Sequence, residues 1–227
     1  MKCFNVVIRG RKIDRMAIAK PGNTVSNETR LSEPPFSQAC ENNKTPILEI
    51  LQNVFVDCRR ILEIGSGTGQ HAVYFGRALP HITWQTSDRA EYLPGIRMWL
   101  AEAALPNVRE PLELDVAGDW PVNNADAVYS ANTAHIMSWA QVECLFAGVG
   151  WVLSAGGVFC LYGPFNYGGR FTSESNARFD AWLKARDPLS GVRDFEALEK
   201  LAEAAGLRLL HDFEMPANNR TLVWRRD

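Results

Sequence analysis

A glycine-rich loop follows a short apolar run in the stretch ILEIGSGTGQHAVYF, residues 61–75. The glycines are spaced as Gly65-x-Gly67-x-Gly69, and Glu63 precedes them. A strand, glycines and then the first turn of a helix form a site for a polar or anionic ligand, because unpaired N–H groups point out of that turn and glycine lets the backbone approach the ligand. The same glycines also occur in ordinary tight turns, so the neighbouring residues must identify the ligand.

Those neighbours argue against two common ligands. A phosphate-binding P-loop requires Gly-Lys-Ser/Thr, and no lysine follows these glycines. The dinucleotide fingerprint G-x-G-x-x-G requires glycine at position 70, where Gln70 stands, which disfavours a dehydrogenase. Glu63 would repel a pyrophosphate, whereas it would attract the amino group of a zwitterionic amino acid or a sulfonium.

Helices and strands alternate from about residue 43 onward. The apolar spacing predicts strands at 61–64, 82–87, 111–115, 126–132 and 158–163, and helices at 45–57, 68–79, 96–103, 139–153 and 195–205. Thr45 and Pro46 are read as the N-cap and first position of the first helix. Strands separated by helices of this length imply right-handed crossovers, so we expect an α/β, doubly wound, mostly parallel sheet.

Three segments depart from this alternation. Residues 164–192, rich in Gly, Ser, Asn and aromatics, are expected to be an insertion or lid with one helix around 179–187. The runs 207–215 and 220–226 are too close for a crossover and predict an antiparallel C-terminal hairpin at the sheet edge. Residues 1–30 are expected to be a basic, disordered extension, with Met16 an alternative start and a transit peptide the competing interpretation. Residues 31–227 would then form a single domain.

The composition limits the partners. The 227 residues carry 24 Lys+Arg against 26 Asp+Glu, a net charge of -2, so there is no positive field to hold nucleic acid. Five cysteines without a C-x-x-C pair argue against a disulfide framework or a zinc ribbon, and four dispersed histidines predict metal independence. No apolar run approaches the roughly 20 residues that cross a bilayer. We expect a cytoplasmic monomer or homodimer without a membrane or nucleic-acid partner.

The E-x-G-x-G-x-G form resembles the first motif of class I S-adenosylmethionine-dependent methyltransferases. Longer phrases, among them SGTGQHAVYF, WQTSD, LDVAGDWP and MPANNRTLVWRR, resemble the family of domain of unknown function 938 and methyltransferase-like protein 26 over roughly residues 32–226. The resemblance implies a Rossmann-like seven-stranded methyltransferase sheet that binds S-adenosyl-L-methionine. It names no substrate.

The resemblance also implies cofactor roles for particular residues. Asp88 would accept hydrogen bonds from the ribose hydroxyls, and Asp115 would receive the adenine amino group beside the backbone N–H of Val116. Lys44 would pair with the methionine carboxylate, for which a solvated surface lysine is the alternative. The cofactor-binding residues expected are Glu63, Gly65, Ser66, Gly67, Gly69, Asp88, Asp115, Val116, Asn132 and Lys44.

The acceptor is expected at the end of the fourth strand. No Pro-Pro follows Asn132, which disfavours amide or exocyclic-amine methylation through that motif. Asn132 and His135 are the candidate catalytic residues, His135 as a base or acceptor-orienting group, with a packing histidine the open alternative. His71 is assigned to the cofactor side. The candidate substrate residues are Tyr162, Asn166, Tyr167 and Arg170, with a solvated loop as the competing interpretation.

The sequence therefore predicts a methyltransferase that acts on a small-molecule acceptor by in-line methyl transfer. The alternative is a non-catalytic S-adenosylmethionine-binding or protein-interaction module on the same fold.

Overall fold

The structure, a computed structural model, describes residues 33–227. Residues Pro34–Asp227 form one compact unit. The expected extension over residues 1–30, with Met16, lies outside the described residues. Within the described part, no helix is long and apolar enough to cross a membrane.

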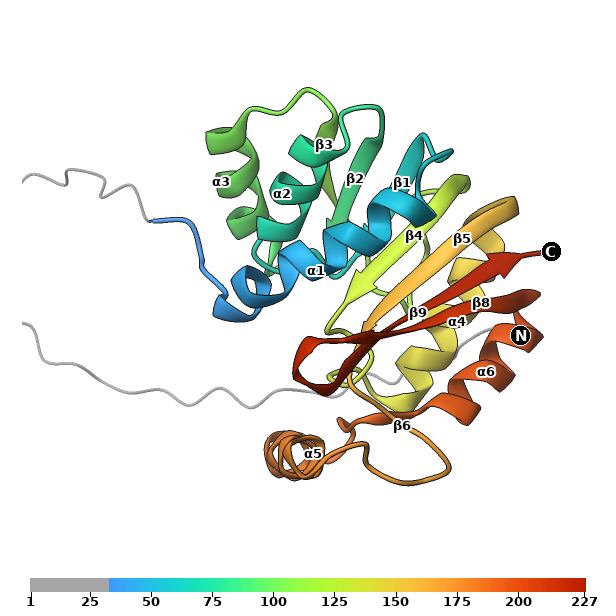
Figure 1. The fold of residues 1–227 in the computed structure, drawn as a ribbon. Helices are drawn as coiled ribbons and strands as arrows, with labels where there is room; N and C mark the ends of the chain where they lie inside the picture. The colour runs from blue at the N-terminus through green and yellow to red at the C-terminus, as the bar shows by residue number, and fades with distance from the viewer. Residues whose placement is uncertain (1–32) are drawn as a thin grey trace, which may run out of the picture. The chain divides into compact units, whose positions relative to one another are not determined.

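Seven strands form one sheet in the order β3-β2-β1-β4-β5-β9-β8 (Figure 1). They are β1 (Arg60–Ile64), β2 (Thr83–Asp88), β3 (Val108–Glu113), β4 (Ala125–Ala131), β5 (Leu153–Gly163), β8 (Leu207–Met215) and β9 (Asn219–Arg226). Strands β1 to β5 pair in parallel, and β9 pairs antiparallel with both β5 and β8. This confirms the predicted doubly wound sheet with an antiparallel C-terminal hairpin.

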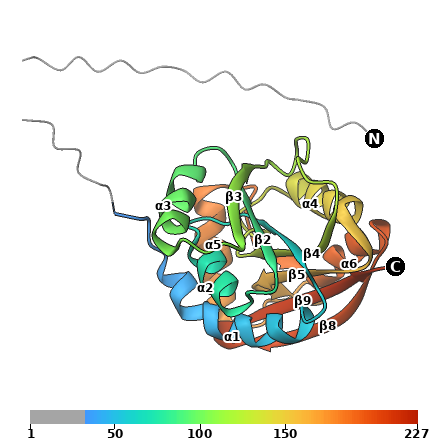
Figure 2. The same cartoon turned by 90° about the horizontal axis from the view of Figure 1, so that it is seen from above.

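Helices cover both faces of the sheet (Figures 1 and 2). One face carries α1 (Gln38–Val54), α2 (Gln70–Ala78) and α3 (Leu93–Ala103), and the other carries α4 (Trp139–Val152) and α6 (Phe195–Ala204). Helix α5 (Glu174–Arg186) lies beyond the carboxyl ends of the parallel strands. The short strands β6 (Phe165–Asn166) and β7 (Arg193–Asp194) pair in parallel and close the base of the insertion that holds α5.

The predicted start of the first helix is wrong. Helix α1 begins at Gln38, capped by the Ser37 side chain, and Pro46 lies inside it. Proline in a helix interior removes the hydrogen bond to the carbonyl four residues earlier, and its ring clashes with that carbonyl, at a total cost of about 3 kcal/mol. Burial at the i, i+4 positions Asn43, Ile47 and Leu51 continues across the proline, so packing against the sheet outweighs that loss. The extra turns before Pro46 lie next to the glycine loop.

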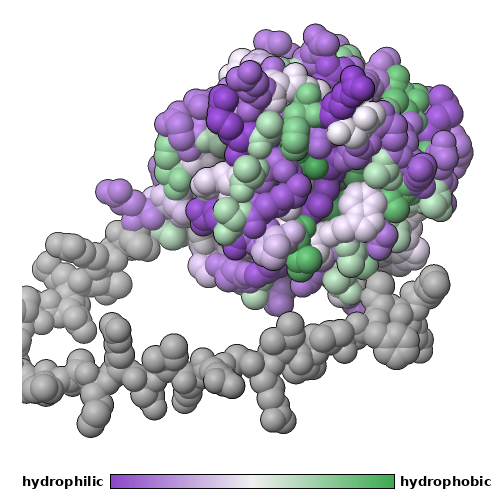
Figure 3. All heavy atoms as spheres, turned by 90° about the horizontal axis from the view of Figure 1, so that it is seen from below, coloured by the Kyte–Doolittle hydropathy of each residue, from purple (hydrophilic) through white to green (hydrophobic). Residues whose placement is uncertain are grey.

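Each face of the sheet has its own apolar core, because side chains of a strand alternate between faces. The core under α4 and α6 contains Leu62, Val128, Phe159, Leu161 and Trp224. The core under α1 and α2 contains Ile61, Phe75, Trp84, Tyr129 and Val223. The outer surface shown in Figure 3 is largely hydrophilic, with hydrophobic residues in small separate groups.

Candidate functional site

The glycine loop is fixed against the end of the neighbouring strand. The backbone N–H groups of Gly65 and Ser66 both donate to the Ser87 carbonyl, at 3.0 Å each. The N–H of Gly67 donates to the Asp88 carboxylate at 2.7 Å. The loop after β1 and the carboxylate that ends β2 therefore form one continuous polar surface.

The three glycines have different neighbours, although all have positive φ, the left-handed region that favours glycine. A Cβ on Gly65 would lie 2.5 Å from the Thr133 methyl, and one on Gly69 would lie 3.2 Å from the Ile96 backbone. A Cβ on Gly67 would meet nothing within 4 Å. Gly65 and Gly69 thus allow close packing within the protein, whereas the open side of the loop is at Gly67, where a ligand can reach the backbone.

Glu63 is buried beside this loop, with 2% of its surface exposed. Its carboxylate accepts hydrogen bonds from Ser66 Oγ at 2.8 Å and Trp84 Nε1 at 3.0 Å. Burial raises the pKa of Glu63 to about 7, and the two hydrogen bonds oppose part of that rise. A cationic group brought against Glu63 would favour its charged form.

Asp88 is also mostly buried, at 9% exposure. It accepts from the N–H groups of Gly67 and Arg89, the latter at 2.8 Å. Burial raises the pKa of the Asp88 carboxyl, and these two N–H donors lower it again in part. A carboxylate offers about four lone-pair sites, so Asp88 retains capacity for further donors such as hydroxyl groups.

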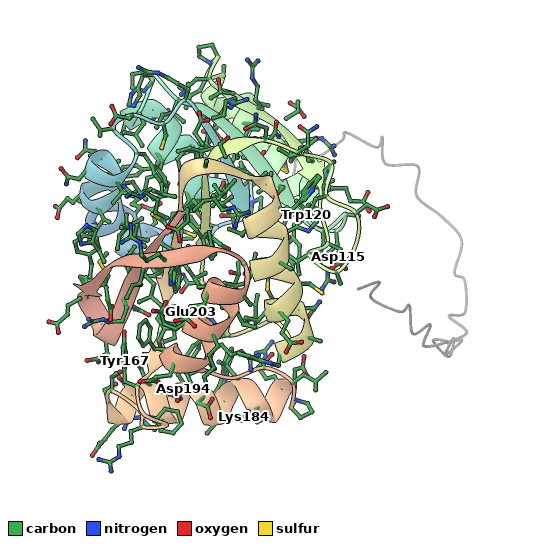
Figure 4. All side chains as sticks on the ribbon, turned by 90° about the vertical axis from the view of Figure 1, so that its right-hand side faces the viewer. Asp115, Trp120, Tyr167, Lys184, Asp194 and Glu203 are labelled. Carbon is green, nitrogen blue, oxygen red and sulfur yellow. The ribbon has the colours of Figure 1, made fainter. Side chains whose placement is uncertain are left out.

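Asp115 follows Asp88 at the same end of the sheet, because the Leu114 N–H donates to the Asp88 carbonyl at 2.9 Å. The Asp115 side chain is exposed and accepts from the Ala117 N–H at 3.0 Å. Figure 4 shows Asp115 with Trp120 on the loop after β3. Val116 is buried in the core on the α4 side. The adenine contacts of Asp115 and Val116 remain predictions.

Helix α1 is attached to the glycine loop through Gln70. The side-chain oxygen of Gln70 accepts from the Ser37 N–H and from Thr68 Oγ1 at 3.0 Å, and its amide donates to Glu41 at 2.9 Å. The residue that breaks the dinucleotide fingerprint therefore docks the first turns of α1 beside the loop. Spacing within the loop contained no signal for this role, because the partners lie about 30 residues earlier.

Lys44 is occupied within the protein. It forms an ion pair with Glu41, and its ammonium lies 4.9 Å from the centre of the Tyr74 ring. Pairing with a cofactor carboxylate would require it to leave Glu41, so this role stays a prediction.

His71 belongs to a buried polar network. Its Nε2 lies 2.7 Å from Asn43 Oδ1 and its Nδ1 lies 3.4 Å from the Tyr129 hydroxyl. Burial lowers the pKa of His71 to about 4, so the ring is neutral at pH 7. The network joins α1, α2 and β4 on the side of the sheet that holds Glu63. The sequence interpretation did not include Asn43 or Tyr129 in this set.

The turn after β4 touches the glycine loop. Ser130 Oγ donates to the Ile64 carbonyl at 2.7 Å and lies 2.7 Å from Thr133 Oγ1. Thr133 in turn contacts Gly65. Asn132, with φ of 59°, stands between them, and its N–H donates to the Tyr162 carbonyl at 2.9 Å. The residues expected at the acceptor thus lie directly beside those expected at the cofactor.

His135 is 6% exposed, and its ring lies edge-on to Phe179 with ring centres 5.2 Å apart. Arg193 holds the surrounding turn by donating to the carbonyls of Ala134, at 2.9 Å, and Met137. Burial, with a smaller contribution from Arg193, lowers the pKa of His135 to about 4. The neutral ring is a weak base at pH 7, so the orienting role and the packing alternative both stay predictions.

The four candidate substrate residues are dispersed. Tyr162 is buried in the core on the α1 side, and Asn166 donates to the Val192 carbonyl at 3.4 Å. Tyr167 donates to Asp212 at 2.7 Å and stacks on Phe195, whereas Arg170 is exposed. Figure 4 places Tyr167 near Asp194, well apart from Asp115.

A cavity of about 370 Å³ opens at the carboxyl end of the parallel strands, and none of the four candidate substrate residues lines it. Its walls are Asn132 and Pro164, the residues Ser175, Asn176 and Phe179 of α5, and the β8–β9 turn at 217–219. Asn132 is the one predicted site residue that lines it. Within the described part of the chain, no three His, Cys, Asp or Glu side chains are grouped to hold a metal ion.

Several solved structures have a similar fold. An O-methyltransferase family protein from Burkholderia thailandensis matches with a TM-score of 0.73 and 16% identity over 81% of this chain and 56% of that chain. The S-adenosylmethionine-dependent methyltransferase SibL matches at 0.70 and 23% over 83% and 55%. PigF, solved with SAH, matches at 0.70 and 18% over 82% and 56%. The chain thus spans 55 to 56% of the length of these proteins.

One family model covers nearly all of the described chain, from residue 34 to residue 226. This agrees with the family resemblance of the glycine loop and of the phrases that follow it. The chain belongs to the family described as protein of unknown function (DUF938), and it has the fold of class I S-adenosylmethionine-dependent methyltransferases.

Proposed function

We propose that this protein is an S-adenosylmethionine-dependent methyltransferase that acts on a small-molecule acceptor. The observation that carries the proposal is the placement of Glu63, the open side of Gly67 and the Asp88 carboxylate at the ends of two adjacent strands. Glu63 would face the cationic methionine end of the cofactor, and Asp88 would accept from the ribose hydroxyls. The similar structures support the same ligand, because they include the S-adenosylmethionine-dependent methyltransferase SibL and PigF, which was solved with SAH.

These residues fit the cofactor. Gly67 leaves room beside the loop, Asp88 keeps free lone pairs, and Glu63 gains a favourable partner for a charge that burial disfavours. When bound, S-adenosylmethionine supplies an electrophilic methyl group whose sulfonium charge disappears on transfer. The chain has to align the acceptor and exclude water, which the docked turns of α1 and the turn at Asn132 would do.

Isothermal titration calorimetry tests the cofactor. We expect S-adenosylmethionine and S-adenosylhomocysteine to bind and NAD not to bind. Asp88→Ala should weaken binding by about 1–3 kcal/mol, because charge-assisted hydrogen bonds are lost. Asp119→Ala, an exposed acid on the loop after β3, is the matched control and should bind like the wild type. Binding of NAD but not of S-adenosylmethionine would refute the proposal.

Transfer is tested separately with a labelled methyl group and a metabolite extract. We expect label to appear in a small molecule. Cofactor binding without transfer to any compound would instead favour a non-catalytic cofactor-binding module.

A further inference from the structure

We propose that the cavity between Asn132, α5 and the β8–β9 turn binds the methyl acceptor, and that this acceptor is a small uncharged aromatic molecule with a hydroxyl group. The assignment as acceptor rests on the function proposed above. The chemistry of the ligand is argued from the cavity alone.

The position of the cavity links it to the cofactor loop. Asn132 lines the cavity, and the next residue, Thr133, contacts Gly65 of the loop. Figure 1 shows the β8–β9 turn and α5 at the carboxyl end of the sheet, below the end of β4. The cavity therefore adjoins the loop that we propose to bind the cofactor, because consecutive residues of one turn contact both.

The cavity carries no formal charge. Among the described residues none of its lining side chains is Asp, Glu, Lys, Arg or His. Bringing an ion into such a site without a counter-ion costs free energy. Ser175 and Asn176 also lie in the first turn of the 13-residue helix α5, whose positive dipole end disfavours a cation. An uncharged ligand fits these walls better than an amine.

The amide groups favour a ligand that donates a hydrogen bond. The side-chain nitrogen of Asn176 donates to Thr172 Oγ1 and the Asn218 carbonyl, that of Asn218 to Ser175 Oγ, and that of Asn219 to the Pro216 carbonyl. The side-chain oxygens of these asparagines accept from no described residue. A hydroxyl can donate to such an oxygen, whereas a carboxylate or phosphate brings only more acceptors.

The remaining walls indicate a ring. Phe179 and Pro164 are the large apolar side chains of the lining, and Phe179 is held between His135 and Trp182, with ring centres 5.2 and 5.8 Å away. An aromatic face in a fixed position favours an aromatic ligand. A volume of about 370 Å³ is near the lower end of small-molecule pockets, which suits a compound of one or two rings.

The hairpin turn fixes one wall of the cavity. Four non-glycine residues of the described chain have positive φ, and three of them, Asn132, Ala217 and Asn218, line the cavity. Ala217 and Asn218 are the central residues of the β8–β9 turn, which the Asn219 N–H closes by donating to the Pro216 carbonyl. Positive φ at both central positions matches the twist of an antiparallel hairpin, so the turn holds this wall in a defined position.

The experiment uses three probes that share a naphthalene ring and differ in the charge of the substituent: 2-naphthol, 2-naphthoate and 2-naphthylmethylammonium. They are added to the full chain with saturating S-adenosylhomocysteine. Ligand-detected NMR measures their dissociation constants. We expect naphthol to bind at least tenfold more tightly than either ion. Ser175→Trp, which fills the cavity from an exposed helical position of α5, should weaken naphthol binding tenfold or more, whereas Ala181→Trp on the exposed side of the same helix should not.

A second variant tests the charge without changing the shape. Asn218→Asp keeps a residue that tolerates positive φ, and it should reverse the preference from naphthol toward the ammonium probe. Three results would each overturn the proposal: equal or tighter binding of either ion by the wild type, absence of naphthol binding, or naphthol binding unaffected by Ser175→Trp. Binding of S-adenosylhomocysteine, the product of methyl transfer from S-adenosylmethionine, is measured separately by calorimetry. Failure of the cofactor assignment is therefore distinguished from failure of the cavity assignment.

Discussion

The replacement Glu63→Gln distinguishes the stability that the buried Glu63 carboxylate costs the folded chain from the contribution of that carboxylate to cofactor binding. Glutamine has almost the same shape as glutamate, and its side-chain oxygen can still accept from Ser66 and Trp84. The replacement therefore removes the titration of the group while keeping its packing. No other acid of the glycine-loop site is as deeply buried as Glu63.

The magnitude follows from the pKa of Glu63, about 7 in the folded chain against an ordinary value of 4.5. Between these two pH values the folded state binds more protons than the unfolded state, so the stability of the wild type falls as the pH rises. At about 1.4 kcal/mol for each pH unit, the loss is roughly 3 kcal/mol and is complete above pH 7. Glu63→Gln carries no such loss.

The assay is urea unfolding of the wild type and Glu63→Gln at pH 5 and pH 8, without cofactor. We expect the variant to gain about 2.5 kcal/mol relative to the wild type between these two pH values, because part of the loss already lies below pH 5. Glu49→Gln, on the exposed side of α1, is the control and should follow the wild type. The same Glu63→Gln variant should bind S-adenosylmethionine more weakly at pH 8, because it lacks the carboxylate that we propose to face the cation. A stability difference that is independent of pH would refute the reasoning.

Four further substitutions test the glycine loop, the attachment of helix α1 to that loop, and the turn around His135. Gly67→Ala should keep the free energy of unfolding in urea within about 1 kcal/mol of the wild type but weaken cofactor binding in calorimetry. Gly65→Ala, whose Cβ would lie 2.5 Å from the Thr133 methyl, should lower the free energy of unfolding by about 1–3 kcal/mol. Equal effects of the two variants would contradict the assignment of the open side of the loop to Gly67. Gln70→Ala should speed amide hydrogen exchange at 38–44 through loss of the bonds to Ser37 and Glu41, and unchanged exchange would show that α1 is held otherwise. Arg193→Lys should slow methyl transfer at saturating cofactor and leave the cofactor dissociation constant unchanged. The reason is that Arg193 holds the turn around His135 and not the glycine loop. A change in cofactor affinity alone would argue against this positioning role.

The local sequence pattern was sufficient to predict the sheet and the glycine loop between β1 and α2. The apolar runs and their spacing depend on which neighbours in the chain share a face, so they predicted five parallel strands and the C-terminal hairpin. Gln70 and Glu63 distinguished the loop from a dinucleotide motif for the same reason, since the discriminating residues lie within eight positions of one another.

Packing between distant segments decided the rest. Pro46 was read as a helix start, yet α1 begins at Gln38 because its buried face and the contacts of Gln70 continue through the proline. The cavity is formed by Asn132, Asn176 and the turn at 217–219, which come together only when α5 and the β8–β9 hairpin reach the end of the sheet. The sequence by itself therefore determined the fold and pointed to the donor. The walls that would face an acceptor were decided by tertiary structure, because no local periodicity records which distant side chains meet across a cavity.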